Sequence, residues 1–406
     1  MLFRSGTRVR WLAGLALALA GTAAASGAWS SRQAPQGGAG AADPRRDNVV
    51  LVILDDVGID ALGLYAGVNA HRADLAQRRG DAYPRMPHLD SLAQDGVLFT
   101  QARVDPTCSA TRASILTGRY AFRHGIGSLV VPVKESELGL VSAAELGVGP
   151  EREQVTLAHL AHAAGYEALI AGKYHLALES GQQALGGAPG SGARHVGEVA
   201  GFDHHWLVWG NLPREPPPAP FVDEDGREYP PGYYNFEALR DGVPEKRRGE
   251  YATDVVVDEA LRLVRAAAKP WFLVLAFNAP HAPYEWPPAE RVATSAYLEL
   301  RTSDNGPGGR ARWSSWPTYN AMLEAVDAAL GRFMAGLEAD GERERTWFFV
   351  VGDNGTPNHV LEHAVDYNDL PVGKTSMMLV RDKLPRFKHS AFEGGVRVPL
   401  IASGPG

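Results

Sequence analysis

Residues 49–56 read Val-Val-Leu-Val-Ile-Leu-Asp-Asp, an apolar run that ends in two adjacent carboxylates. Three later apolar runs, at 168–171, 271–277 and 347–351, also lead directly into polar residues. A strand that is buried on both faces needs such a continuous run, whereas a strand with one wet face alternates apolar and polar residues. Because helical patterns lie between the runs, the sequence predicts an α/β fold with a large, mainly parallel sheet flanked by helices.

Two of the intervening helices are defined by their own residues. Thr156 is a suitable N-cap for a helix that continues through Ala164 and stops at Gly165. Apolar residues between 319 and 337 recur at helical spacing, which predicts an amphipathic helix before the fourth strand. The stretch 178–249 is rich in glycine and proline, so we expect long loops over the sheet edge there.

Composition limits the classes of function. The chain has 406 residues, of which 45% are hydrophobic, and this excludes a disordered protein and a disulfide mini-protein. Lysine and arginine number 40 against 47 aspartates and glutamates, so the formal net charge is −7. With this mildly acidic balance and no basic block, we expect no nucleic-acid partner and no binding to anionic membranes.

The N-terminus has the pattern of a secretory signal peptide. Three arginines precede an apolar stretch from Trp11 to Ala25, and three alanines at its end offer a cleavage site. We assign residues 1–25 to the signal peptide, 26–47 to a flexible linker and 48–406 to one large domain. The protein is therefore expected in the periplasm or outside the cell, without stable membrane insertion after cleavage; an uncleaved anchor is the alternative.

Carboxylates and an amide follow the first and fourth strands. Asp55 and Asp56 end the first run, and Asp353 and Asn354 come just after the fourth. In open α/β sheets, ligands bind beyond the carboxyl ends of the strands. Adjacent carboxylates repel each other unless a cation lies between them, and oxygen ligands favour Ca²⁺ or Mg²⁺ over Zn²⁺. The sequence therefore predicts a divalent-cation site at this edge.

Cys108 is the only cysteine, so no intrachain disulfide can form. The residues that follow it suit a helix, which would place the thiol at a helix N-terminus with Arg112 one turn further on. We interpret this as an electropositive setting that makes the thiol reactive. The simpler alternative is a small buried apolar residue.

Cationic and proton-donating side chains complete the pattern. A nucleophile and a divalent cation beside two ammonium groups and two imidazoles would suit a tetrahedral oxyanion, because cations neutralise its oxygens and imidazoles transfer protons. A single histidine is more often structural, but three of these groups follow predicted strands. The residues are Lys173, His175, His281 and Lys388.

These motifs resemble those of the sulfatase family in the alkaline-phosphatase superfamily, from about Asn48 to the end of the chain. The segment from Cys108 to Arg112 is similar to Cys-x-Pro-x-Arg, with Ala110 in place of the proline, and is followed by Thr-Gly-Arg. Residues 172–175, Gly-Lys-Tyr-His, resemble Gly-Lys-Trp-His. Further elements match in order: Pro280-His281, Asp353-Asn354-Gly355, and Lys388 five residues before Glu393-Gly394-Gly395.

The resemblance implies an alkaline-phosphatase-like fold and an arylsulfatase-like sulfuric ester hydrolase. In that family a formylglycine-generating enzyme oxidises the cysteine to Cα-formylglycine, whose hydrate attacks the sulfate ester. The implied substrate is a sulfated small molecule or carbohydrate. The implied cofactors are formylglycine derived from Cys108 and Ca²⁺, with Mg²⁺ as the second choice.

The roles of the individual residues follow from the same resemblance. Arg112 would steady the formylglycine, Lys173 and Lys388 would bind sulfate oxygens, and His175 and His281 would assist attack and leaving-group protonation. His124 is a weaker candidate outside the centre of the site. The implied metal ligands are Asp55, Asp56, Cys108, Asp353 and Asn354.

The sequence also departs from the family pattern. Ala110 puts recognition by the formylglycine-generating enzyme in doubt, and Lys374 competes with Lys388, which we prefer for its spacing. The chain stops at Gly406, where relatives continue for about one small domain. We therefore expect the small C-terminal domain to be missing and the apolar run 398–402 to leave a sheet edge open.

Three other functions remain open from the sequence. A phosphonate or phosphate ester hydrolase could use the same formylglycine site, because sulfate and phosphate are nearly isosteric. A Zn²⁺ phosphatase could use Thr107 or Thr111, although it would need imidazole ligands where Asn354 stands. A secreted oxyanion-binding protein without catalysis is the third alternative.

Overall fold

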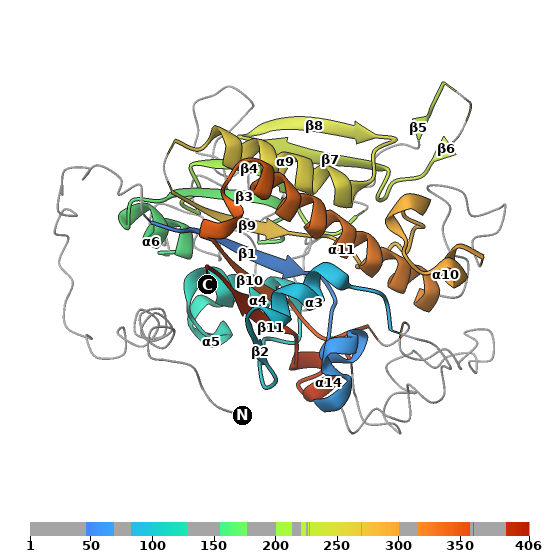
Figure 1. The fold of residues 1–406 in the computed structure, drawn as a ribbon, viewed down its shortest axis with the longest axis horizontal. Coiled ribbons are helices and arrows are strands. Elements are labelled where there is room, and N and C mark those ends of the chain that lie inside the picture. Colours follow the sequence, from blue (N-terminus) through green and yellow to red (C-terminus); the bar gives the residue numbers. More distant parts are fainter. Residues whose placement is uncertain are drawn as a thin grey trace. The chain divides into compact units, whose positions relative to one another are not determined.

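The four apolar runs lie side by side in one sheet (Figure 1). In spatial order they are β10 (Thr346–Gly352), β1 (Asn48–Leu54), β9 (Trp271–Ala276) and β3 (Glu167–Lys173), and all are parallel. Their carboxyl ends therefore meet at one edge, as predicted. The computed structural model describes residues 46–68, 83–127, 155–176, 200–212, 221–224, 226, 228–268, 270–299, 315–357, 360 and 387–405.

Shorter strands extend the sheet on both sides. Beyond β3 lie β4 (His204–Val208), parallel to it, and the antiparallel hairpin of β7 (Asn235–Arg240) and β8 (Val243–Arg248). Beyond β10 lie two antiparallel strands, β11 (Leu400–Ser403) and β2 (Val97–Phe99). Within the described residues this gives a mixed nine-stranded sheet. A separate hairpin pairs β5 (Phe221–Val222) with β6 (Glu228–Tyr229).

Two expectations about the outer strands are wrong. The stretch 178–249 is not only loop, because β4, β7 and β8 lie within it. β7 and β8 lie at one edge of the sheet and mix charged with apolar residues, so they lack a continuous apolar run. The final strand also leaves no open edge of its own, because β2 pairs with β11 on the side away from β10.

Helices cover both faces of the sheet, which confirms the predicted layers. Alternate residues of β1 enter different cores: Val52 belongs to the larger core and Ile53 to the second. The helices of the larger core are α3 (Pro87–Gln94), α9 (Ala252–Ala266) and α11 (Ser315–Ala339). The helices of the second core are α4 (Cys108–Thr117) and α6 (Leu157–Ala163).

Local signals set several helix ends. Thr156 caps α6 as predicted: its hydroxyl accepts a hydrogen bond from the His159 amide at 3.3 Å. α11 contains the predicted amphipathic stretch. The remaining short helices are α5 (Ala121–His124), α10 (Ser295–Glu299), α14 (Glu393–Val396), η1 (Ile59–Ala61), η2 (Gly63–Val68), η4 (Ala289–Arg291) and η5 (Arg343–Arg345).

The predicted N-terminal segments fall almost wholly outside the described part of the chain. The signal peptide at 1–25 lies entirely outside it, and of the linker at 26–47 only the last two residues are described. Both assignments stay predictions. Among the described helices, none combines the length and apolar character needed to cross a membrane.

Candidate active site

The carboxyl edge of the parallel strands gathers the predicted site residues, and nearly all of their surface is buried. Asp55 and Asp56 follow β1, and Asp353 and Asn354 follow β10. Lys173 is the last residue of β3. The other members of the cluster are His175 after β3, His281 after β9, Cys108 and Arg112 on α4, and Lys388 before α14.

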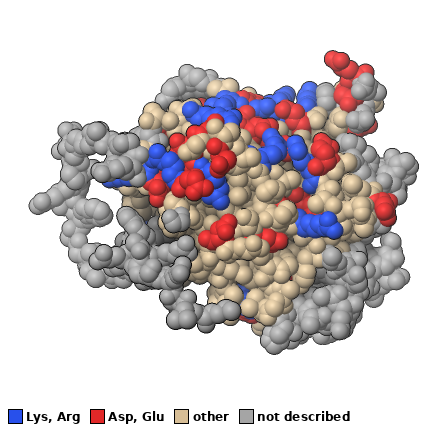
Figure 2. Space-filling model, in the orientation of Figure 1, with Lys and Arg blue, Asp and Glu red and all other residues tan. Residues whose placement is uncertain are grey.

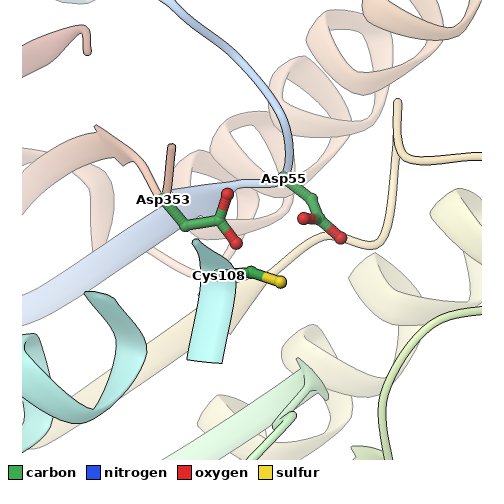
Figure 3. Close-up of side chains that lie close together, drawn as sticks. All are labelled: Asp55, Cys108 and Asp353. Atoms are coloured by element: carbon green, nitrogen blue, oxygen red, sulfur yellow. The ribbon is translucent and has the colours of Figure 1, made fainter. Parts of the chain in front are cut away.

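Two carboxylates and the thiol form a compact group, drawn in Figure 3. One ligand atom each of Asp55, Cys108 and Asp353 lies within 4.8 Å of the other two. One oxygen of this group, Oδ1 of Asp55, is buried and has no hydrogen-bond partner in the described part of the chain. The same is true of Oδ1 of Asn354, the residue after Asp353. Because buried polar atoms without partners are costly, these oxygens fit the ligand set of a hard divalent cation.

Backbone geometry brings the ligands of β1 and β10 together. Asp56 has a left-handed backbone, with φ of 64°, which is unusual for a residue other than glycine. Its amide donates to Oδ1 of Asp353 at 3.0 Å, and its carbonyl accepts from the Tyr319 hydroxyl at 2.8 Å. The Asn354 amide group donates to Oδ1 of Asp56 at 2.8 Å, which leaves its own Oδ1 uncommitted.

Each carboxylate of the cluster has a cationic partner, and Asp55 has Arg112 as a second one, with Nη2 3.9 Å from its Oδ1. The Lys173 ammonium contacts Asp55, and the Lys388 ammonium lies 2.5 Å from Oδ1 of Asp56. Arg112 donates two hydrogen bonds to Oδ2 of Asp353, from Nη2 at 2.8 Å and Nε at 3.0 Å. Three buried negative charges therefore face three buried positive charges. A bound divalent cation would make the site net positive, which would favour an anionic substrate.

The pKa values of two carboxyls in the cluster are shifted in opposite directions. Burial raises the pKa of Asp353 to about 6, and the neighbouring charge of Asp55 adds to this against the pull of Arg112. Burial also acts to raise the pKa of Asp56, but the Lys388 ammonium and a hydrogen bond from Asn354 outweigh it, so that pKa lies well below its ordinary value. The site thus holds Asp56 ionised even without a metal.

The Cys108 thiol lacks the lowered pKa that a reactive cysteine needs. Its Sγ lies 3.3 Å from Nδ1 of His175, but burial raises the pKa of the thiol to about 11, against the opposing effect of Lys173 and Lys388. A thiol with this pKa stays protonated at neutral pH and is a poor nucleophile. The setting is electropositive as expected, but desolvation of a fully buried sulfur is the larger effect.

Both histidines of the cluster are neutral. Burial lowers the pKa of His281 to about 3, and burial with the charges of Lys173 and Arg112 lowers the pKa of His175 well below its ordinary value. The Nδ1–H of His281 donates to the Ala282 carbonyl at 2.7 Å, so its Nε2 is the acceptor and lies 3.7 Å from Oδ2 of Asp56. Both rings can therefore take up a proton in the site.

Asn211 belongs to the site and was missed in the sequence. Its Oδ1 accepts a hydrogen bond from the Lys173 ammonium at 2.6 Å. Asn211 comes three residues after the end of β4. Like the four predicted strands, β4 therefore leads from apolar residues into a polar side chain at its carboxyl end. The sequence does not single out Asn211, because the glycines and prolines of the stretch 178–249, which contains β4, indicate loops.

Two further candidates lie elsewhere. His124 is outside the cluster: its ring contacts the Ser114 hydroxyl at 3.0 Å and accepts from the Ile126 amide at 3.1 Å. Since Ser114 in turn donates to Asp105 at 2.6 Å, His124 supports the loop before Cys108. Lys374 lies outside the described residues, whereas Lys388 contacts the cluster directly.

Comparison with known proteins matches this arrangement to a family. The family model described as Sulfatase matches residues 47–406, which include every member of the cluster. The chain belongs to the sulfatase family. Its fold is accordingly alkaline-phosphatase-like, with the parallel strands of the sheet presenting the site at their carboxyl ends.

Named relatives of this sulfatase-family chain are between a quarter and a third identical to it. N-acetylgalactosamine-6-sulfatase from Canis lupus familiaris is 28% identical over 381 residues, covering 91% of this chain and 59% of its own length. Arylsulfatase A from Homo sapiens is 27% identical over 376 residues, covering 91% of this chain and 61% of its own length. The chain thus spans about three-fifths of the length of these relatives.

A solved structure has the same fold. The crystal structure of Ps i-CgsB in complex with k-i-k-neocarrahexaose superposes with a TM-score of 0.57 and 22% sequence identity. The match covers 89% of this chain and 66% of that one. At this identity the likeness establishes the architecture of the sheet and its helices.

Proposed function

We propose that the protein hydrolyses sulfate esters, with residue 108 converted to Cα-formylglycine and a divalent cation bound beside it. The observation that supports this most strongly is the position of Cys108. It is the only cysteine, it begins α4, and its Sγ lies within 4.8 Å of a carboxylate oxygen from each of Asp55 and Asp353.

The metal site would use oxygen ligands from two strand ends. Asp55, Asp56, Asp353 and Asn354 would hold the cation together with residue 108, and all four are oxygen donors that suit Ca²⁺, with Mg²⁺ second. When bound, the cation would supply positive charge to the reacting sulfate oxygens. The free oxygens of Asp55 and Asn354 support this ligand set.

The side chains around residue 108 would orient the nucleophile and take its proton. Formylglycine, as its hydrate, would supply the attacking oxygen. His175, 3.3 Å from Sγ of Cys108, is neutral and is placed to accept a proton from a group at this position. Arg112 would hold residue 108 in position, because its guanidinium connects α4 to the Asp353 carboxylate and donates to the Lys173 carbonyl at 2.7 Å.

The lysines and His281 would act on the substrate. The ammonium groups of Lys173 and Lys388 are buried in the site and would neutralise sulfate oxygens as negative charge develops. The negative charge of a bound ester raises the pKa of nearby His281, so its Nε2 could gain a proton and pass it to the leaving oxygen. These roles agree with those implied by the sequence motifs.

The substrate is proposed to be a sulfated carbohydrate. Two relatives carry names that point in this direction, N-acetylgalactosamine-6-sulfatase and ulvan-active sulfatase. Maturation would need a formylglycine-generating enzyme, with Ala110 at the third position of its recognition segment. With residues 1–25 as a signal peptide, the mature enzyme would act in the periplasm or outside the cell.

Sulfate release is the direct test of this function. The chain, co-expressed with a formylglycine-generating enzyme and supplied with Ca²⁺, is assayed on an aryl sulfate, an aryl phosphate and a 6-sulfated N-acetylgalactosamine. We expect the two sulfate esters to be turned over faster than the phosphate, and the Cys108→Ala variant to be inactive. Faster turnover of the phosphate would establish the phosphatase alternative, and binding of sulfate esters without turnover would establish the non-catalytic one.

A further inference from the structure

A buried tyrosine outside the catalytic cluster lies beneath the segment that carries His281. Tyr233, just before β7, has no exposed surface, and its ring stacks on Tyr251 with centroids 5.6 Å apart. Its amide donates to Oε2 of Glu285 at 2.8 Å, and its carbonyl accepts from the Ala252 amide at 2.8 Å. Backbone and ring are thus both held, so the hydroxyl has a defined position.

The Tyr233 hydroxyl holds both ends of one turn. It lies 2.8 Å from the carbonyl oxygen of Asn278 and 2.8 Å from that of His281, and its single proton is shared between these two acceptors. The His281 amide donates to the Asn278 carbonyl at 2.9 Å, which closes the turn. Among the described residues, these contacts connect the backbone of the turn to the core beneath it. The direction of the His281 ring therefore depends on the tyrosine.

The same turn also supports the other side of the site. The Asn278 side chain donates to the Gly210 carbonyl at 2.8 Å, and the next residue, Asn211, accepts from the Lys173 ammonium. Gly210 itself lies against the His175 ring: a Cβ there would be 3.1 Å from it. Asn278 thus links the turn held by Tyr233 to the segment that positions Lys173 and His175.

We infer that Tyr233 is a positioning residue for leaving-group protonation by His281. The inference rests on the proposed function, because His281 has this role only if the protein hydrolyses sulfate esters. The hydroxyl fixes the turn, and the turn fixes the ring whose Nδ1–H donates to the Ala282 carbonyl. This leaves Nε2 as the acceptor, 3.7 Å from Oδ2 of Asp56. Tyr233 does not act on the substrate itself.

The test compares Tyr233→Phe with Tyr234→Phe. Tyr234 is a matched control, because its buried hydroxyl also donates to a backbone carbonyl, that of Trp286 at 3.0 Å, but not to the turn. Turnover is measured on two aryl sulfates, one with an acidic and one with a basic phenol as leaving group. A good leaving group needs little proton transfer, whereas a basic one depends on it.

For Tyr233→Phe we expect kcat to fall by less than about tenfold on the acidic phenol and by about a hundredfold on the basic one, the lower end of what a general acid contributes. For Tyr234→Phe we expect a change of less than about twofold on both. Equal losses for the two substrates in Tyr233→Phe would show a merely structural role and overturn the inference.

A second readout does not depend on activity. The readout is the ¹⁵N NMR spectrum of the protein labelled with ¹⁵N-histidine, in which the His281 signals are assigned by their loss in His281→Asn. The parent protein should show the Nδ1–H tautomer of His281 that the hydrogen bond to the Ala282 carbonyl requires. Tyr233→Phe should change these nitrogen shifts and Tyr234→Phe should not. Unchanged shifts in Tyr233→Phe would overturn the inference. If the parent hydrolyses no sulfate ester, the proposed function fails and the nitrogen shifts alone decide whether Tyr233 positions the ring.

Discussion

Cys108 shows how much the environment of one residue decides its chemistry. Removing its Sγ eliminates the group from which the nucleophile is made, but leaves only a small gap at the start of α4. We expect Cys108→Ala to abolish turnover while it lowers the free energy of unfolding by only about 1 kcal/mol. Steady-state turnover and urea denaturation measure the two effects. Unreduced turnover in this variant would show that residue 108 is not the nucleophile.

The carboxylates around Cys108 lead to a prediction about the metal. A cation that binds only the folded chain stabilises it by about 2.7 kcal/mol at a hundred times its Kd. We expect Ca²⁺ or Mg²⁺ to raise the Tm of Cys108→Ala more than Zn²⁺ does, and a chelator to reverse the rise. Asp353→Asn, which removes one ligand charge, should weaken the effect. A Tm that does not respond to Ca²⁺ would contradict the proposed ligand set.

At the scale of elements, the loop after β10 packs backbone to backbone on α14. A Cβ on Gly355 would lie 1.8 Å from the Gly394 carbonyl oxygen, and the Gly355 amide donates to the Gly395 carbonyl at 2.8 Å. We expect Gly355→Ala to destabilise the fold by about 3 kcal/mol, because neither backbone can move aside easily. The control is Gly67→Ala, where a Cβ meets nothing within 4 Å. Equal urea midpoints for the two variants would contradict this packing.

A second prediction concerns the ion pairs that join α9 to the β7–β8 hairpin. Figure 2 shows mixed positive and negative side chains over the part of the molecule where Figure 1 places these elements. Glu259 on α9, with a side chain 8% exposed, accepts from Arg240 on β7 at 2.6 and 2.7 Å, from Arg247 on β8 at 2.6 Å and from Arg262 at 2.8 Å. One carboxylate thus connects three elements.

The pH dependence of this connection follows from its pKa. Burial acts to raise the pKa of Glu259, but hydrogen bonds from Arg240 and Arg262 outweigh it and lower that pKa below 4.5. The folded state therefore favours the ionised form, and its contribution is complete above pH 4.5 and lost as the pH falls through the folded pKa. We expect Glu259→Gln to cost about 2 kcal/mol at pH 7, below the ~3–5 kcal/mol of a fully buried pair.

Urea denaturation of the parent and of Glu259→Gln at several pH values measures the free energy of unfolding that the Glu259 ion pairs contribute. The difference between the two chains should be full at pH 7 and should shrink below pH 4.5. A difference that grows as the pH falls would mean that the folded state favours the protonated form instead.

The elements that the sequence predicts well are those with one dominant physical signal. β1, β3, β9 and β10 are buried on both faces, so their continuous apolar runs were readable. The strands β4, β7 and β8 were not: β7 and β8 mix charged with apolar residues, and β4 is held by pairing with β3 and β7, each about 35 residues away in the sequence. Asn211 was missed with β4, and the pairing of β2 with β11 depends on register that no local pattern encodes.

At the scale of the whole molecule, the site draws on strand ends and loops from residue 55 to residue 388. The sequence indicated which side chains meet, because parallel strands bring their carboxyl ends to one edge. It did not indicate how they pair: Lys173 with Asp55, Lys388 with Asp56, and Arg112 with Asp353. These pairings, and the burial that raises the pKa of Cys108, need the complete three-dimensional packing.

The central claim is that Cys108 becomes formylglycine, and the mass of one tryptic peptide tests it most directly. Cleavage after Arg103 and Arg112 releases residues 104–112, which contain residue 108. In chain co-expressed with a formylglycine-generating enzyme, we predict that this peptide carries an aldehyde in place of the thiol and reacts with a hydrazine reagent. A peptide with an intact thiol, from a sample that still releases sulfate from an aryl sulfate, would contradict the account.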